Sequence, residues 1–376
     1  MPTINLLAFR SVVIILLVFS VSFFSCTVPE TPVTKEEALK FSADIERTIA
    51  ARNSVMIDHI LDETEFSKHV AKEIGNASDK DLIKGAMEAI NKSRYGQQII
   101  QGIGKKGTYL LVKQYELNNR QHLIFRMYGN NKVNYHDYEL VKKNDVIKAA
   151  DMFIYLSGEN LSKTLTNAML ILKDNMPNMS KEDMDKIKKI KKIRALMSER
   201  DFVKAEEMYD ELPANFKNQK LFLIMHLQIA MELNNDAYEN AMNDYISLYP
   251  NDPNMFLLMI DNYTLKKDYP KALESINKLD SFINKDPFQD YYRGLVYKLM
   301  NDTIQSEKCF ERLYSNMPKF GDGVVELMAV DVKTGKIDKA VQVTQQAITD
   351  KSVSPETLDF MYTKYPALKK AMDHVK

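Results

Sequence analysis

The stretch RGLVYKLMNDTIQSEKCF, from Arg293 to Phe310, has the layout of a helix, a short polar turn and a second helix. Ser306 is a small residue near the start of the second helix, and Phe310 follows it four positions later. A small side chain allows two helices to approach closely, and a large one fills the groove toward the next element. The stretch therefore predicts a tightly packed helix pair.

The same layout recurs through the second half of the chain. The small residue lies at Ala205, Ala241, Ala272, Ser306 and Ala340, so the spacings are 36, 31, 34 and 34 residues. A large residue follows four positions later at Tyr209, Tyr245, Ile276 and Phe310. One such pair cannot bury its apolar face alone. The period therefore predicts about five helix pairs that stack into a solenoid over residues 178–350.

These intervals resemble the tetratricopeptide repeat, which the stretch from Gly294 through Ser306 and Phe310 to Pro318 matches without a gap. The resemblance implies an all-α solenoid that holds another polypeptide in a concave groove lined by the first helices of each pair. The family's groove positions fall on Ile190, Met225, Leu257, Tyr291 and Val325. This row is apolar and lacks the lysine and asparagine with which some members clamp a carboxylate. It predicts an apolar or helical ligand; the alternative is that the row packs against the N-terminal half.

The ends of the solenoid carry their own signals. Residues 351–376 depart from the repeat and predict C-terminal capping helices, with Ser354 as N-cap and Pro355 at the first helical position. Before the repeats, Thr34 and Glu37 form a capping box that opens a helix reaching about Arg52. A second helix is expected from about Ser54, and a third from about residue 78 to Gly102.

Residues 34–177 predict an α+β domain. After the helices the pattern changes to Tyr-, Val- and Ile-rich segments separated by Asn- and Gly-rich turns, which indicates a four-stranded antiparallel meander. The expected strands are Thr108–Glu116, Gln121–Tyr128, Lys132–Lys142 and Asp145–Leu156. By topology alone the arrangement is similar to the cystatin-like cone, a fold that can hold a small ligand in its curved sheet.

A candidate pocket on this sheet would use His122, Tyr135, His136 and Asp137, because a His–Asp pair with tyrosines can transfer protons. His136 and Asp137 are consecutive, however, so on a regular strand they face opposite sides. We therefore interpret these four residues as part of a sheet face with a structural role, and we expect no catalytic residue. No HExxH spacing occurs, and we expect neither a metal nor a cofactor.

The N-terminal sequence predicts where the protein is located. Residues 1–25 contain Arg10 and the apolar run Ser11–Ser25, which as a helix would cover about 22 Å and is too short to span a bilayer. The run is typical of an export signal. Its end at Cys26 resembles a bacterial lipoprotein signal, although Phe23 replaces the usual aliphatic residue. The resemblance implies cleavage before Cys26 and acyl chains on it; plain secretion and a retained anchor are the alternatives.

Residues 26–33 contain two prolines and predict an extended tether. We expect a lipid-anchored protein of the bacterial envelope, in the outer rather than the inner membrane, with its body in the periplasm or at the cell surface. Cys309, the second cysteine, then has no partner for an intramolecular disulfide. Lys plus Arg equals Asp plus Glu at 51 each, so charge favours no nucleic-acid partner.

Three functions follow from these patterns. The first is a scaffold or adaptor that binds another envelope protein or peptide through the repeats. The second is a small-ligand-binding or catalytic N-terminal domain with accessory repeats. The third is a surface glycan-binding lipoprotein, which the absence of tryptophan disfavours without excluding it.

Overall fold

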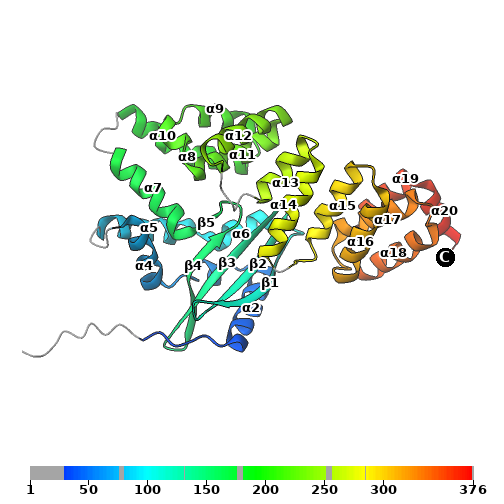
Figure 1. Ribbon diagram of the computed structural model, residues 1–376, viewed down its shortest axis with the longest axis horizontal. Helices are drawn as coiled ribbons and strands as arrows, with labels where there is room; N and C mark the ends of the chain where they lie inside the picture. Colours follow the sequence, from blue (N-terminus) through cyan, green and yellow to red (C-terminus); the bar gives the residue numbers. More distant parts are fainter. Residues whose placement is uncertain are drawn as a thin grey trace, which may run out of the picture.

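A computed structural model describes residues 29–75, 80–130, 132–175, 181–250, 256–283 and 285–374. The predicted signal segment and Cys26 lie outside these residues. The chain forms an N-terminal α+β region and a C-terminal all-helical region (Figure 1). Among the described residues, no helix combines the length and apolarity needed to cross a bilayer.

The N-terminal helices are shorter and more numerous than predicted. Helix α2 (Lys35–Ala50) begins at the expected capping box of Thr34 and Glu37. The predicted second helix is two helices, α3 (Val55–Asp58) and α4 (Glu63–Ile74), and the predicted third is also two, α5 (Lys80–Ser93) and α6 (Tyr95–Ile103).

Tertiary contacts explain both interruptions. The helix is interrupted between α3 and α4 because the backbone there bonds to the sheet. The Asp62 amide donates to the Ala149 carbonyl oxygen, and the Ala149 amide donates to the Ile60 carbonyl oxygen. Between α5 and α6, Arg94 adopts φ of 47°, a left-handed conformation that ends α5. Gly96 then approaches the turn before α3 so closely that an added Cβ would lie 2.6 Å from the Ser54 carbonyl oxygen. The spacing of apolar residues along a helix carries no information about such contacts.

The sheet has five antiparallel strands in the order β1-β2-β3-β4-β5. They are β1 (Thr108–Leu117), β2 (Arg120–Gly129), β3 (Lys132–Lys143), β4 (Val146–Ile154) and β5 (Glu159–Asn160). The prediction of a four-stranded meander is confirmed for β1 to β4 and missed the two-residue β5. Asn118, Asn119, Asn130 and Asn144 all adopt positive φ at the hairpins, a conformation that asparagine tolerates well.

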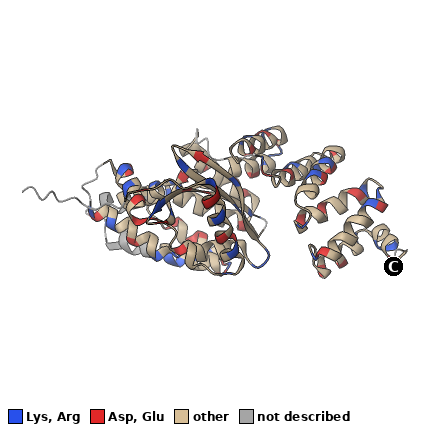
Figure 2. Cartoon of the chain, turned by 90° about the horizontal axis from the view of Figure 1, so that it is seen from below, with Lys and Arg blue, Asp and Glu red and all other residues tan. Residues whose placement is uncertain are grey.

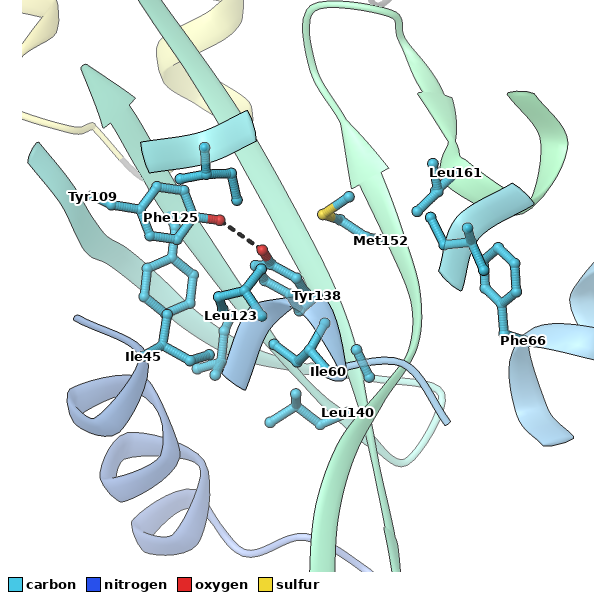
Figure 3. Packing of buried hydrophobic residues seen from close by; sticks show 14 of the residues in the cluster. Ile45, Ile60, Phe66, Tyr109, Leu123, Phe125, Tyr138, Leu140, Met152 and Leu161 are labelled. Atoms are coloured by element: carbon cyan, nitrogen blue, oxygen red, sulfur yellow. Dashed lines mark hydrogen bonds between the residues drawn. The ribbon is translucent and has the colours of Figure 1, made fainter. Parts of the chain in front are cut away.

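One face of the sheet carries the core of the N-terminal region. Leu123, Phe125 and Tyr138 lie on this face and pack against apolar side chains of α2 to α6, such as Ile45 (Figure 3). The Tyr138 hydroxyl is satisfied within this core by the Tyr109 hydroxyl at 2.8 Å. Helix α7 (Leu161–Asn175) packs against α4, α5 and β4 and so belongs to the same region.

The helical region consists of successive packed pairs. They are α8 (Lys181–Ser198) with α9 (Phe202–Asp210), α11 (Lys220–Leu233) with α12 (Asn235–Leu248), α13 (Phe256–Leu265) with α14 (Tyr269–Phe282), α15 (Gln289–Leu299) with α16 (Thr303–Asn316), and α17 (Gly321–Lys333) with α18 (Ile337–Asp350). The short α10 (Ala214–Lys217) lies between the first two pairs. Lys and Arg are interspersed with Asp and Glu along these helices (Figure 2).

The residues that predicted the pairs lie inside them. All five small residues, from Ala205 to Ala340, are buried, and so are Tyr209, Tyr245, Ile276 and Phe310. Helices α19 (Pro355–Lys364) and α20 (Pro366–His374) close the C-terminal end. The Ser354 hydroxyl accepts a hydrogen bond from the Thr357 amide, which confirms Ser354 as the N-cap.

The second face of the sheet packs against the helical region. Ile124, Tyr128 and Tyr135 of the sheet form one apolar cluster with residues of α13, α14 and α15, including Leu257 and Ile276. In Figure 1 the helical region runs from α8 to α12, passes the sheet at α13 and α14, and continues to α20. The sheet is therefore covered by helices on both faces.

Polar contacts cross the same interface. The Arg126 guanidinium pairs with Asp286, and both side chains are almost completely buried, at 5% and 1% exposure. The Asp286 carboxylate also accepts a hydrogen bond from the Tyr135 hydroxyl at 2.9 Å. Tyr128 donates its hydroxyl proton to Asp322 at the start of α17. These bonds fix the position of the sheet against the helices.

Candidate functional site

A cavity of about 660 Å³ opens beside the contact between the sheet and the helical region. One side is formed by the β2–β3 hairpin and the segment after β4, and the other by α11, α13 and α15. Volumes of this size are typical of sites that take drug-sized ligands or a few side chains. It is the candidate functional site.

The surface of the cavity wall is mainly apolar. It includes Val133, Leu156, Ile224, Leu227, Met231, Leu257, Leu258, Leu265 and Leu299. The sequences of α11, KLFLIMHLQIAMEL, and α13, FLLMIDNYTL, explain this, because both helices are apolar on more than one face. One face of each packs against its paired helix, and the remaining apolar residues border the cavity.

Three polar side chains stand out on this wall: Asp261, Tyr238 and Tyr292. Asp261 is open to water within the cavity, but the surrounding protein desolvates its carboxyl group and raises its pKa to about 6. The positive charge of Lys132 opposes this rise. Burial also raises the pKa values of the Tyr238 and Tyr292 hydroxyls, and the nearby Asp261 charge adds to both shifts. The two phenols therefore stay protonated at any physiological pH.

The predicted groove residues belong to different apolar clusters. Leu257 borders the cavity, and Tyr291 packs between the sheet cluster and the C-terminal helices. Ile190 and Met225 lie in the cluster formed by α8, α9 and α11, and Val325 lies among the apolar residues around α17 and α18. The sheet thus covers part of the face on which the resemblance places the groove.

The structure separates the residues of the predicted sheet pocket onto both faces. His136 points toward the N-terminal helices, where it contacts the hydroxyls of Tyr95 at 3.3 Å and Tyr109 at 3.0 Å. Burial lowers the pKa of His136 to about 3, so its imidazole is neutral. Tyr135 lies on the opposite face and is bound to Asp286.

His122 and Asp137 do meet, on the face opposite His136. The His122 Nδ1 atom lies 3.1 Å from an Asp137 carboxylate oxygen, and the Tyr115 hydroxyl donates to the other oxygen. The His122 and Tyr115 rings stack with centroids 4.8 Å apart. None of these residues lines the large cavity or the small pocket of about 50 Å³ next to α3 and α6. The cluster is a half-buried polar patch on the sheet.

Sequence reasoning did not find Asp261, Tyr238 or Tyr292. A signal was present for the first of them, because Asp261 is the single charged residue in the apolar sequence of α13. Tyr238 and Tyr292 could not be singled out, because the chain contains 19 tyrosines and no sequence pattern distinguishes these two. Within the described residues, no group of three or more His, Cys, Asp or Glu side chains could hold a metal ion. No known family model matches the chain, and no curated protein matches it either.

Proposed function

We propose that this protein is a lipid-anchored tetratricopeptide-repeat protein of a bacterial envelope, and that it binds an apolar segment of another envelope protein in the cavity beside the sheet. The repeat intervals, the buried small residues and the paired helices support the repeat family. The observation that carries the proposal is a cavity of about 660 Å³ with a mainly apolar wall. Open apolar surfaces of this kind are typical of binding sites.

The position of the cavity favours a polypeptide as the ligand. Leu257, a predicted groove residue, lies on the cavity wall and in the apolar cluster that the helices share with the sheet. An apolar helix or strand end could insert several side chains there while the rest of the partner stays in water. The apolar side chains of the wall would supply contact area for such a segment.

Substituting the exposed part of the wall tests this function. Leu299 is 50% exposed and Leu265 half-buried, so a Leu265→Gln, Leu299→Gln double variant should fold while losing apolar contact area. The control is Leu248→Gln, Ile348→Gln, whose leucine and isoleucine are similarly exposed, at 44% and 47%, and lie outside the cavity. We expect about a tenfold loss of affinity for envelope partners in the first variant only.

The measurement is affinity capture from detergent-solubilised envelopes with each variant as bait, followed by titration of the recovered protein. A partner retained equally by both variants would remove the cavity from the proposed function. Circular dichroism of both variants checks that they fold.

The proposed anchor predicts acylation of Cys26. Cells given radiolabelled palmitate should incorporate it into the wild-type protein and not into Cys26→Ser. The variant should also move from the membrane to the soluble fraction, because the acyl chains contribute about 0.8 kcal/mol per buried methylene to membrane binding. Equal labelling of the two proteins, or no labelling of either, would contradict the anchor and leave the cavity binding unaffected.

A further inference from the structure

Asp261 places a carboxylate on the wall of a largely apolar cavity. Within the described residues it makes no hydrogen bond or ion pair, although it borders a wall of leucines. Two buried acids of this protein do have partners: Asp286 has Arg126 and Tyr135, and Asp151 accepts from the Ser162 hydroxyl. The buried Asp331 accepts no hydrogen bond within the described residues, but it does not border the cavity. A charge in such surroundings is costly unless it is paired. The unpaired carboxylate therefore suggests that its partner is a ligand.

A second, independent feature points the same way. Tyr238 lines the cavity, is only 5% exposed, and its hydroxyl has no hydrogen-bond partner among the described residues. Buried hydroxyl groups are normally satisfied. Tyr238 and Tyr292 both lie close enough to Asp261 for its charge to affect their pKa values. A carboxylate with aromatic side chains nearby is a suitable environment for a cation.

The other charged groups of the cavity lie at its rim. Lys132 is exposed and pairs with Glu232 at 2.8 Å, and Lys267 is exposed at the turn after α13. The positive charge of Lys132 acts on the Asp261 carboxyl group and opposes the rise of its pKa. The remaining titratable group on the wall is the Tyr269 hydroxyl. The Asp261 carboxyl group, with its pKa raised to about 6 by desolvation, changes its charge near pH 6.

We propose that Asp261 selects partner segments in which a lysine lies among apolar residues, and that the lysine ammonium pairs with the Asp261 carboxylate inside the cavity. The inference rests on the proposed function and specifies its ligand. The apolar wall would hold the neighbouring side chains and the methylenes of the lysine, while the Tyr238 and Tyr292 rings flank the charge. A glutamine of the partner segment in the place of this lysine would leave the Asp261 carboxylate without a counter-charge.

The test compares two fluorescein-labelled amphipathic peptides of leucine and glutamine, which differ only in a central lysine or glutamine on the apolar face. Fluorescence anisotropy measures their binding to the mature chain. At about pH 8 we expect the lysine peptide to bind about tenfold more tightly. The ratio should fall to about one as the pH drops through 6, because Asp261 becomes protonated while the peptide lysine stays charged.

The matched variants are Asp261→Asn and Asp359→Asn, which make the same change of net charge. Asp359 is exposed on α19, far along the chain from the cavity. In Asp261→Asn the two peptides should bind with about equal affinity, because the lysine peptide loses its advantage while the glutamine peptide still binds. In Asp359→Asn the preference for the lysine peptide should be the same as in the wild type. Equal binding of both peptides by the wild type would overturn the lysine selection and leave the apolar binding standing. Binding of neither peptide would overturn both proposals.

Discussion

Replacing Asp286 with alanine is expected to lower the free energy of unfolding by about 3–5 kcal/mol, the largest single-residue effect that we predict. The substitution leaves the Arg126 guanidinium charged and buried without its partner. The Tyr135 hydroxyl loses its acceptor, and the Phe288 amide loses a bond of 3.2 Å that orders the start of α15. Because Asp286 bonds to both the sheet and the helical region, the loss should weaken their contact directly.

Urea unfolding followed by circular dichroism measures this effect as a lower transition midpoint. An Arg126→Met, Asp286→Leu double variant removes both charges and should recover most of the loss, since apolar residues can replace a buried ion pair at little cost. Glu274→Ala removes an exposed ion pair with Lys278 and should change stability by less than about 0.5 kcal/mol. If Asp286→Ala behaved like Glu274→Ala, the buried pair would not hold the two regions together.

The sequence permits the local structure to be predicted where short-range physics decides it. Small residues at a period near 34 mark the helix pairs, because close helix approach requires them. The capping box at Thr34, the N-cap at Ser354 and the asparagine turns of the sheet are likewise properties of a few adjacent residues. Each of these features is found at its predicted position.

The contact between the two regions could not be predicted in this way. The sequence Asp286-Pro287 is typical of an ordinary turn at the end of a helix. Its partner Arg126 lies 160 residues earlier, on a strand. No periodicity connects the two positions. The breaks around Ile60 and at Arg94 have the same origin, since each depends on a segment distant in the sequence or on a single left-handed residue.

The candidate site depends on this long-range contact. The family resemblance placed Leu257 on a concave surface, and it does border the cavity, but the cavity itself exists only because the β2–β3 hairpin lies opposite α11 and α13. Asp261 gains its raised pKa from the same enclosure. Sequence analysis could therefore identify a wall residue, whereas the chemistry of the site required the docked structure.

Replacing Gly294 with alanine is expected to destabilise the helical region by about 1–3 kcal/mol, although alanine is the better helix former. An added Cβ would lie 2.5 Å from the Phe310 ring, which is completely buried and cannot move away. The Ser306 hydroxyl also donates to the Gly294 carbonyl oxygen at 2.9 Å and holds α15 and α16 at this separation. The overlap must therefore be relieved by moving the helices apart.

Gly85 provides the matched control, because it lies inside α5 and a Cβ there would contact only the Met169 sulfur at 3.4 Å. Gly85→Ala should stabilise the protein by about 0.5–1 kcal/mol through helix propensity alone, so the two glycine substitutions should shift the urea midpoint in opposite directions. Adding Phe310→Leu to Gly294→Ala should cost less than the sum of the single substitutions, because the smaller side chain removes the overlap. Additive effects would show that the Gly294–Phe310 contact does not set the spacing of this helix pair, and the physical reason for a glycine at this position of the repeat would be lost.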